Sequence, residues 1–391
     1  MSNDTEARLR DYLEAKALTV ADDTPAPIQQ FAHRRRHWPV LVAAAAVVAL
    51  VVPLALHFDD RRSAPEPAMT STLVWKAGAG KVSTIAKPSA LRVPYLLSTP
   101  DISEPFAAVY DGKTRVTLPR TQDARLIGRV ANGWLLKLTN MGKPSELGIL
   151  DRAGRFALLT TYADWVALSP DRSKVAVGQI IGKKSRIVSI DLATGRQLDA
   201  LTAPFDQIHV YGWNRDGVWY SEYNRGNNNP QPRVWQPGSK ERVVEMSGFS
   251  SLKVAADSDR LVVNVAGNGQ GCQKVVSLTA SGTFEVVRES CASSKPAIYP
   301  FPSPNGEFIA NPDRRFALHV DNGKQIKLTG LSGAPDPINN VYEDSNHLLV
   351  NAVTSYAFNA PQVINRCDVR SGKCRVVHRQ SGKYTIGLGT P

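Results

Sequence analysis

The feature that most constrains this chain is an internal repeat of about 42 residues, in which two kinds of turn alternate between strand-like runs. One kind centres on a glycine, the residue that most readily adopts the positive φ required by tight hairpin turns. Successive glycines lie 42, 41, 43, 44, 41 and 49 residues apart, at Gly112, Gly154, Gly195, Gly238, Gly282, Gly323 and Gly372.

The second kind of turn centres on Asn or Asp and lies about half a period out of phase with the glycines. Asn and Asp side chains accept hydrogen bonds from nearby backbone N–H groups and so favour turns. Six clear positions are Asn132, Asp171, Asp216, Asp257, Asn305 and Asp344, and a weaker first copy surrounds Ser89.

Two hairpins in each repeat make four short strands, which is the content of a propeller blade. Seven glycine turns therefore predict an all-β fold, a seven-bladed β-propeller over residues 75–391. Residues 384–390 remain as an extra strand, which is expected to pair with the first blade and close the ring. Short strands at this spacing also allow a pair of β-sandwiches, but the regular period favours the propeller.

The repeats resemble those of bacterial β-propellers with Ser-Pro-Asp-Gly motifs, the TolB-like or WD40-like group. The resemblance covers roughly residues 75–390 and is carried by Ser169–Asp171, Ser303–Gly306 and Asp191–Gly195. The chain departs from this pattern because no Gly-His or Trp-Asp dipeptide closes a repeat, and within the Asn/Asp turn series Asp-Gly occurs only at Asp216 and Gly217. The resemblance implies the propeller architecture and leaves the subfamily open.

An uncharged run from Trp38 to Phe58 predicts a single transmembrane helix over residues 38–58. Its length is enough for a hydrocarbon core of about 30 Å, and the 37 residues before it are too many for the usual leader of a cleaved signal peptide. Arg34, Arg35 and Arg36 precede the run, so the positive-inside rule places residues 1–37 in the cytoplasm. Residues 59–391 are then expected outside the plasma membrane, beginning with a Pro-rich stalk over residues 59–74.

The cytoplasmic segment contains a possible short amphipathic helix over residues 4–18. Asn3 and Glu6 have capping-box spacing, and Leu9, Tyr12 and Leu13 lie on or near one helical face. This pattern predicts either a docking helix for a cytoplasmic protein partner or a solvated juxtamembrane tail. The head, anchor and Ala/Val-rich span loosely resemble actinobacterial anti-sigma-type membrane proteins, but the head lacks the cysteines of a zinc-type motif.

The formal charge is +12, but residues 1–37 carry six basic and six acidic side chains and are neutral. The basic excess therefore lies in the segment expected outside the cell, where an anionic membrane or a cell-wall polymer is available. This location argues against nucleic acid as the partner and favours a protein or glycan partner.

The four cysteines are expected to form two disulfides, Cys272–Cys291 and Cys367–Cys374. Each pair is symmetric about a predicted glycine turn, and residues equidistant from a turn face each other in a hairpin. Disulfides suit an oxidising compartment. No C-x-x-C spacing suggests a metal site.

Motifs for catalysis or cofactors are incomplete in this sequence. The run AGAGKVST lacks the residues that a phosphate loop requires, and in GFSSL Leu252 replaces the last glycine of a nucleophile elbow. The histidines are dispersed, with only His33 and His37 at i,i+4 spacing. We therefore expect no catalytic residue, cofactor or metal.

The loops on the face opposite the two turn series vary in length and carry polar and aromatic residues, which suit partner proteins or glycans. The predicted binding residues are Lys183, Lys184, Tyr223, Arg225, Asn227, Asn228 and Tyr356. The sequence thus predicts a membrane-anchored, extracytoplasmic propeller that is not an enzyme and serves for binding, sensing or scaffolding, with sigma-factor regulation as one form. The alternative is an envelope-located propeller enzyme, a hydrolase or lyase.

Overall fold

The computed structural model describes residues 73–99, 106–118, 123–139, 142–203, 207–223, 230–267, 270–292, 300–336, 339–355 and 360–391. All of them belong to the unit Glu66–Pro391. The predicted segments 1–37 and 38–58, and nearly all of the stalk, lie outside these ranges. None of the helices in the described ranges is long and apolar enough to cross a membrane.

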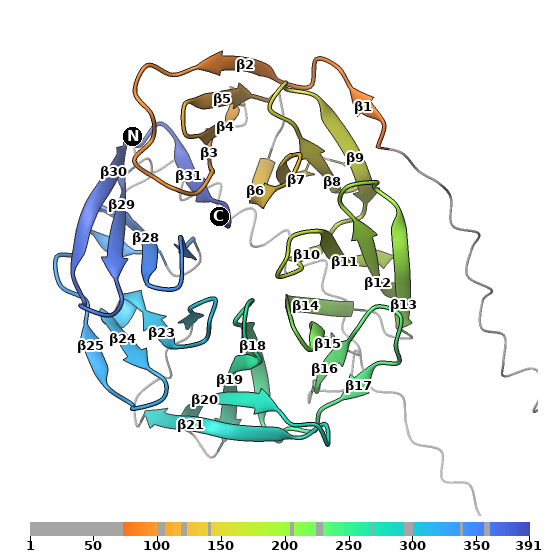
Figure 1. The fold of residues 1–391 in the computed structure, drawn as a ribbon, viewed down its shortest axis with the longest axis vertical. Helices are drawn as coiled ribbons and strands as arrows, with labels where there is room; N and C mark the ends of the chain where they lie inside the picture. The colour runs from red at the N-terminus through yellow and green to blue at the C-terminus, as the bar shows by residue number, and fades with distance from the viewer. Residues whose placement is uncertain are drawn as a thin grey trace, which may run out of the picture. The chain divides into compact units, whose positions relative to one another are not determined.

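The described residues form seven antiparallel sheets arranged as the blades of a β-propeller (Figure 1), which confirms the predicted fold. Blades 3, 4 and 5 each contain four strands in sequence order, from the innermost strand to the outermost. Their strands are β10 (Trp165–Leu168), β11 (Lys174–Ile181), β12 (Lys184–Asp191), β13 (Gln197–Ala203), β14 (Gln207–Asn214), β15 (Gly217–Tyr223), β16 (Pro232–Trp235), β17 (Arg242–Val243), β18 (Phe249–Val254), β19 (Arg260–Gly267), β20 (Gln270–Leu278) and β21 (Phe284–Ala292).

Blades 6 and 7 follow the same plan, except that a short 3-10 helix (Pro312–Arg314) interrupts blade 6 and the inner strand of blade 7 is split in two. Their strands are β22 (Phe301–Pro302), β23 (Phe308–Asn311), β24 (Phe316–His319), β25 (Gln325–Lys327), β26 (Ala334–Pro335), β27 (Val341–Tyr342), β28 (His347–Val353), β29 (Gln362–Asp368) and β30 (Cys374–Gln380).

Blade 1 is built from both ends of the described chain. It contains β3 (Tyr95–Ser98), β4 (Ala107–Asp111) and β5 (Thr114–Thr117), and its innermost strand is the C-terminal β31 (Thr385–Leu388). Strand β31 pairs antiparallel with β3, with Tyr95 opposite Leu388. The predicted closure of the ring by the last strand is therefore confirmed.

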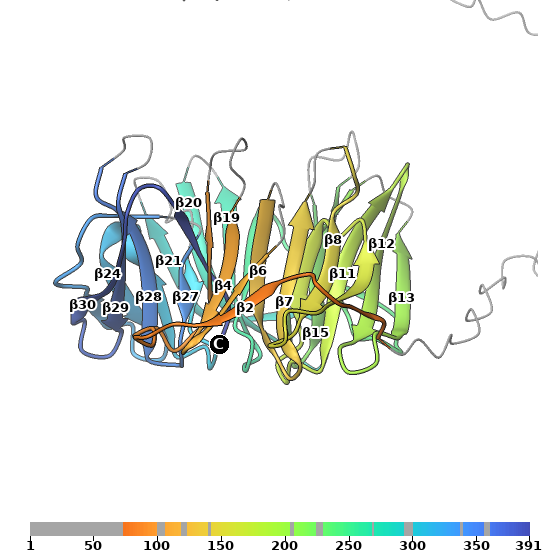
Figure 2. The ribbon, with the colours of Figure 1, turned by 90° about the horizontal axis from the view of Figure 1, so that it is seen from above.

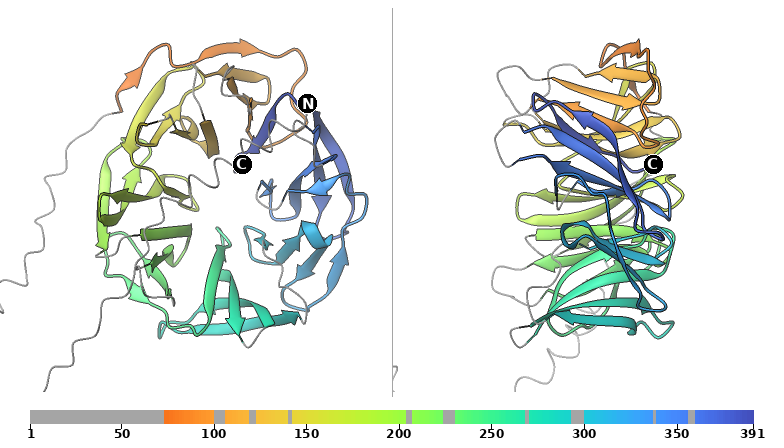
Figure 3. Two further views of the ribbon diagram at one scale, coloured as in Figure 1. Left: turned by 180° about the vertical axis from the view of Figure 1, so that it is seen from behind. Right: turned by 90° about the vertical axis from the view of Figure 1, so that its left-hand side faces the viewer.

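Two short N-terminal strands run along the outer rim of blades 1 and 2 (Figure 3). Strand β1 (Trp75–Lys76) pairs with β9 (Phe156–Thr161), and β2 (Lys81–Thr84) pairs with β5. Blade 2 consists of β6 (Asp123–Val130), β7 (Gly133–Thr139), β8 (Glu146–Leu150), β9 (Phe156–Thr161) and this added β1. The N-terminal segment thus covers the outer edges of two neighbouring sheets, edges that would otherwise present unpaired backbone groups.

Both turn series lie where the sequence predicts them. All seven glycines join the third and fourth strands of their blades, with φ between 59° and 90°. The six clear Asn/Asp turns join the first and second strands. The weak copy around Ser89 is the exception, because in blade 1 the first strand is supplied by β31 and no such hairpin exists.

The apolar core lies between adjacent blades. Side chains alternate across a strand, so β7 packs Trp134 and Leu136 toward blade 1 and Leu135 toward blade 3. These side chains are at most 1% exposed. Burial on both faces of the sheet explains why this strand is apolar almost throughout.

Both predicted disulfides are present. Cys272 and Cys291 are opposite each other in the β20–β21 hairpin, and Cys367 and Cys374 are opposite each other in the β29–β30 hairpin. The turn symmetry in the sequence therefore identified the register of both hairpins.

Candidate functional site

The ring has two faces, which Figure 2 shows edge-on. The first-to-second and third-to-fourth strand connections of the blades lie on one face, which we call the turn face. The second-to-third connections and the crossings between blades lie on the other, which we call the loop face. The innermost strands β6, β10, β14 and β18 all run from the loop face toward the turn face.

Only two of the predicted binding side chains are placed by the structure. Lys183 and Lys184 are exposed at the β11–β12 hairpin on the loop face, where Lys184 pairs with Ile181. The side chain of Tyr223 lies outside the described residues, as do the whole of Arg225, Asn227, Asn228 and Tyr356. Whether these seven residues form one surface therefore stays a prediction.

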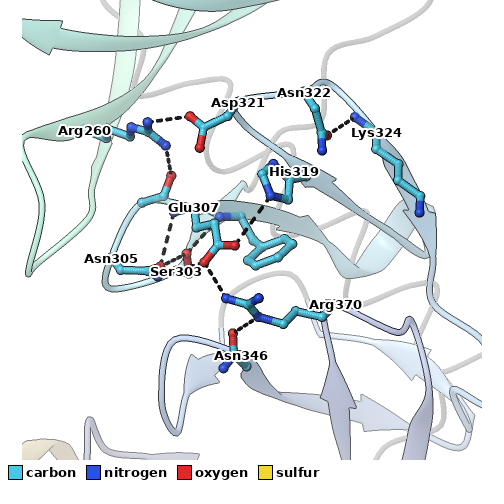
Figure 4. Close-up of polar contacts among 12 residues, drawn as sticks. Arg260, Ser303, Asn305, Glu307, His319, Asp321, Asn322, Lys324, Asn346 and Arg370 are labelled. Carbon is cyan, nitrogen blue, oxygen red and sulfur yellow. Dashed lines mark hydrogen bonds and ion pairs between the residues drawn. The ribbon is translucent and has the colours of Figure 1, made fainter.

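On the turn face, charged side chains join neighbouring blades (Figure 4). Glu307 of blade 6 accepts a hydrogen bond from Arg370 Nη2 of blade 7 at 2.7 Å and lies 3.5 Å from His319 Nε2. Arg370 Nε donates to Asn346 Oδ1 at 2.6 Å. Arg260 of blade 5 reaches Asp321 of blade 6 at 2.6 Å. These contacts hold the blades in register.

Similar contacts join blade 1 to its neighbours. Arg129 of blade 2 binds Asp111 of blade 1, with Nη2 and Oδ1 2.6 Å apart. Glu343 of blade 7 pairs with Arg366 and also accepts a hydrogen bond from the backbone N–H of Arg92 at 3.0 Å. The acidic groups in these contacts therefore have structural partners.

Asp171 acts within its own turn. Its carboxylate accepts hydrogen bonds from Ser169 Oγ at 2.6 Å and from Ser173 N and Oγ at 3.1 and 2.7 Å. The hydrogen bonds from Ser169 and Ser173 lower the pKa of Asp171. In blade 6, Asn305 Oδ1 similarly accepts from Ser303 Oγ at 2.8 Å and from Glu307 N at 3.2 Å. The two turns share one geometry with different residues.

Three cationic side chains gather on innermost strands or beside them. Arg125 of β6 is exposed and is the cross-strand partner of Lys137 of β7, whose Nζ donates to the Asp164 carbonyl oxygen at 3.0 Å. Lys253 of β18 is exposed in blade 5.

The charges of these three cations influence one another. Burial lowers the pKa of Lys137 and of Lys253, and in both cases the charge of Arg125 lowers it further. Arg125 and Lys253 both lie on innermost strands, of blades 2 and 5, with blades 3 and 4 between them in the ring. The Lys253 side chain is accessible to solvent, yet the protein around it is dense enough to reduce its hydration and lower its pKa. A side chain at the inner rim of a ring is expected to have both properties.

Aromatic rings stack along the same inner rim. The Trp165 and His209 rings have centroids 3.7 Å apart at 20°, and the His209 and Tyr211 rings are 4.4 Å apart at 21°. Phe249 meets Tyr211 edge-on at 6.0 Å. Burial, and then the charge of Lys253, lower the pKa of His209 to about 4. His209 is therefore neutral at pH 7.

The aromatic rings and the cations form one group. Trp165 directly follows Asp164, whose carbonyl binds Lys137, and Lys253 is close enough to His209 to lower its pKa. Strands β14 and β18 approach so closely that a Cβ at Gly212 would lie 2.8 Å from Val254 Cβ. We call this group the inner-rim cluster; it consists of Arg125, Lys137, Trp165, His209, Tyr211 and Lys253.

The charges of the inner-rim cluster suit an anion. Within the described part of the chain, neither Arg125 nor Lys253 forms an ion pair, and both are exposed. Asp164 and Asp123 raise the pKa of Lys137 and partly offset the other effects on it. An anionic ligand group between Arg125 and Lys253 would relieve the repulsion between them.

The inner-rim cluster was not predicted from the sequence, although the repeat contains a signal for it. Innermost strands precede the Asn/Asp turns, so a polar or aromatic residue six or seven positions before such a turn lies near the inner rim. Arg125 precedes Asn132 by seven residues, and Trp165 precedes Asp171 by six. His209 precedes Asp216 by seven.

A metal centre is not indicated in the described ranges. Among their residues, the one group of potential metal ligands is Cys272, Glu289 and Cys291. The two cysteines are joined in a disulfide and offer no thiolate.

Comparison with known proteins supports the fold and goes no further. No family model matches the sequence, and no curated protein matches it. Solved structures do match. A puromycin hydrolase variant is 11% identical with a TM-score of 0.50, over 77% of this chain and 54% of that chain. This chain thus spans about half of that protein's length.

Two further solved structures have lower TM-scores. TolB from Acinetobacter baumannii is 10% identical with a TM-score of 0.42, over 78% of this chain and 68% of that one. A putative 6-phosphogluconolactonase from Bacteroides fragilis is 14% identical with a TM-score of 0.47, over 77% and 99%. At such identities the similarity concerns the propeller fold alone.

Proposed function

We propose that this chain is a non-catalytic binding module that takes an anionic ligand at the inner-rim cluster. The observation that carries the proposal is the set of cations on or beside the innermost strands, Arg125 and Lys137 in blade 2 and Lys253 in blade 5, with no ion pair for Arg125 or Lys253 among the described residues. Holding like charges together costs free energy, and a bound anion removes that cost. Arginine adds a planar fork that binds carboxylates or phosphates in two-point fashion.

The proposed location is the outer surface of the plasma membrane. Residues 38–58 would anchor the chain, with residues 1–37 in the cytoplasm and the propeller outside. The two disulfides support this location, because they persist in oxidising compartments. Binding outside would serve sensing or scaffolding, and residues 4–18 would contact a cytoplasmic protein partner. Regulation of a sigma factor by this chain is one form of that role.

Binding is favoured over catalysis by what surrounds His209. Its imidazole lies between the rings of Trp165 and Tyr211, and no hydrogen bond joins it to a carboxylate in the described ranges. A general base needs a proton to abstract within hydrogen-bond reach and a pKa near the working pH. A stacked imidazole with a pKa of about 4 suits the wall of a binding site better.

Binding can be tested on the full chain in detergent by calorimetric titration with triglutamate and trigalacturonate at low and high salt. Arg125→Gln and Lys253→Gln should each weaken the binding of these anions by about tenfold, since each removes a charge-assisted contact. Lys240→Gln and Lys324→Gln are matched controls, because both lysines are exposed in turns between the third and fourth strands of their blades, away from the innermost strands. Equal losses in the two pairs, or no binding at all, would refute the proposed site.

Topology needs a separate test. Protease added to intact cells should digest the propeller and leave an N-terminal fragment protected by the membrane. Full protection of the propeller would contradict the proposed location without affecting the binding proposal.

A further inference from the structure

We infer that the ligand of the inner-rim cluster is an acidic saccharide, with one sugar ring stacked on Trp165 and its carboxylate held by Arg125 and Lys253. This inference rests on the binding function proposed above and specifies the chemical class of the ligand. Three observations carry it: an exposed indole held in a fixed plane, cations beside that plane, and carboxylates close to the cations.

Trp165 is a large aromatic side chain left exposed on the first residue of an innermost strand. It is 36% exposed, whereas Trp134, Trp219 and Trp235 are at most 1% exposed. Burying a tryptophan is strongly favourable, so an exposed one at the inner rim is free to bury its open surface against a ligand. In the described residues, blade 3 thus leaves part of this aromatic surface uncovered at its innermost strand.

The plane of Trp165 is fixed by its neighbours. One face of its ring stacks on His209, and His209 stacks in turn on Tyr211. Tyr211 Oη lies 2.9 Å from Ser221 Oγ, and Phe249 packs against the Tyr211 ring edge-on. Three rings from the next two blades therefore hold the indole. A preorganised aromatic surface loses little entropy when a ligand binds.

A sugar ring suits such a surface. The C–H bonds on one face of a pyranose ring carry a slight positive charge, and the face of an indole carries a negative one. The same contact covers apolar surface on both partners. An extended acidic peptide offers no flat C–H face of this kind.

One of the cations is hydrogen-bonded to the residue next to the aromatic surface. Lys137 Nζ donates to the carbonyl of Asp164, the residue directly before Trp165. Arg125 is the cross-strand neighbour of Lys137, and Lys253 lies on β18, which packs against the strand β14 that carries His209. A ligand ring on Trp165 would thus have an acid group within reach of cations on β6, β7 and β18.

Nearby carboxylates favour a sugar acid over a nucleotide. Asp123 is exposed at the start of β6, and Asp164 lies beside Lys137. Carboxylates accept hydrogen bonds from sugar hydroxyls, and they repel the two negative charges of a phosphate monoester. A ring with several hydroxyls and one carboxylate meets both requirements.

The test uses the full chain in detergent and four ligands: trigalacturonate, triglutamate with a similar negative charge, neutral maltotriose, and AMP. Trigalacturonate should bind at least several-fold more tightly than triglutamate. Trp165→Ala should weaken trigalacturonate binding by about tenfold and leave triglutamate binding unchanged. Trp165→Phe keeps a smaller aromatic face and should lose less. Thermal unfolding of each variant verifies that it is folded.

The outcomes separate this inference from the proposed function. Equal binding of trigalacturonate and triglutamate, with no effect of Trp165→Ala, would refute the saccharide and leave anion binding in place; it would indicate an acidic peptide instead. Tighter binding of AMP than of trigalacturonate would also refute it. If neither trigalacturonate nor triglutamate binds, both proposals fail.

Discussion

Replacing Asp171 by alanine removes the carboxylate that organises the turn between β10 and β11. Three hydrogen bonds are lost, from Ser169 Oγ and from Ser173 N and Oγ. Ser169 keeps its bonds to Lys174, because its Oγ also donates to the Lys174 carbonyl and accepts from the Lys174 N–H. The turn should therefore weaken without collapsing.

The expected cost follows from the exposure of the site. A hydrogen bond contributes about 0.5–1.5 kcal/mol net, and more when the acceptor is charged. The Asp171 side chain is exposed, so water replaces part of what is lost. We expect Asp171→Ala to lower the free energy of unfolding by about 1–2 kcal/mol.

The pH dependence has a definite sign. The hydrogen bonds from Ser169 and Ser173 hold the pKa of Asp171 below its usual range. Its contribution to stability is therefore complete above the unfolded-state pKa of about 4 and is lost as the pH falls through the lower, folded-state pKa. The wild type and Asp171→Ala should differ at pH 7 and converge in acid.

Urea unfolding at pH 7 and at several lower values measures both effects. Asp171→Asn is the matched control, because Asn305 already makes two of these contacts in blade 6. It should cost less than alanine at pH 7. The reasoning would be refuted if Asp171→Ala were neutral at pH 7, or if it abolished anion binding while the protein stayed folded.

Three further predictions concern stability. Arg172 has a φ of 56° at the turn position that Gly306 occupies in blade 6. Arg172→Gly should therefore raise the free energy of unfolding by about 0.5–1 kcal/mol in urea titrations, and a lower free energy of unfolding would contradict this prediction. The double substitution Cys272→Ser and Cys291→Ser removes a disulfide that closes a loop with a sequence separation of 19, and it should lower the free energy of unfolding by about 3 kcal/mol. The melting temperature should fall accordingly, and reductant should have no further effect through this disulfide. Because the pKa of His209 is lowered to about 4, the unfolded chain binds more protons than the folded chain between pH 6.5 and 4, so the free energy of unfolding should fall as the pH drops through that range. His209→Phe should flatten this pH dependence, and an unchanged pH dependence would refute the lowered pKa of His209.

Much of the fold follows from local and periodic features of the sequence. Blade number depends on the spacing of turn residues such as Gly195, and the disulfides depend on symmetry about turns such as that at Gly282. Both are encoded within single hairpins. The pairing of β31 with β3 was predictable because one strand remained after seven repeats were counted.

The parts that escaped prediction depend on contacts between distant segments. Strands β1 and β2 are too short to show a pattern, and they are fixed by the exposed edges of β9 and β5. The inner-rim cluster combines residues from four different blades, namely Arg125, Trp165, His209 and Lys253, which are far apart in the sequence. No spacing in the sequence states how closely these side chains converge at the ring axis.

Closure of the ring by β31 has a consequence for synthesis on the ribosome. Thr385 and Ser98, paired across this junction, are 287 residues apart in the chain. At 5–20 residues per second, the inner edge of β3 waits between about 15 and 60 seconds for its partner strand. During that interval it presents unpaired N–H and C=O groups to any other extended chain. A translation product that stops before residue 384 would keep this edge open permanently, and we expect such a product to aggregate or be degraded.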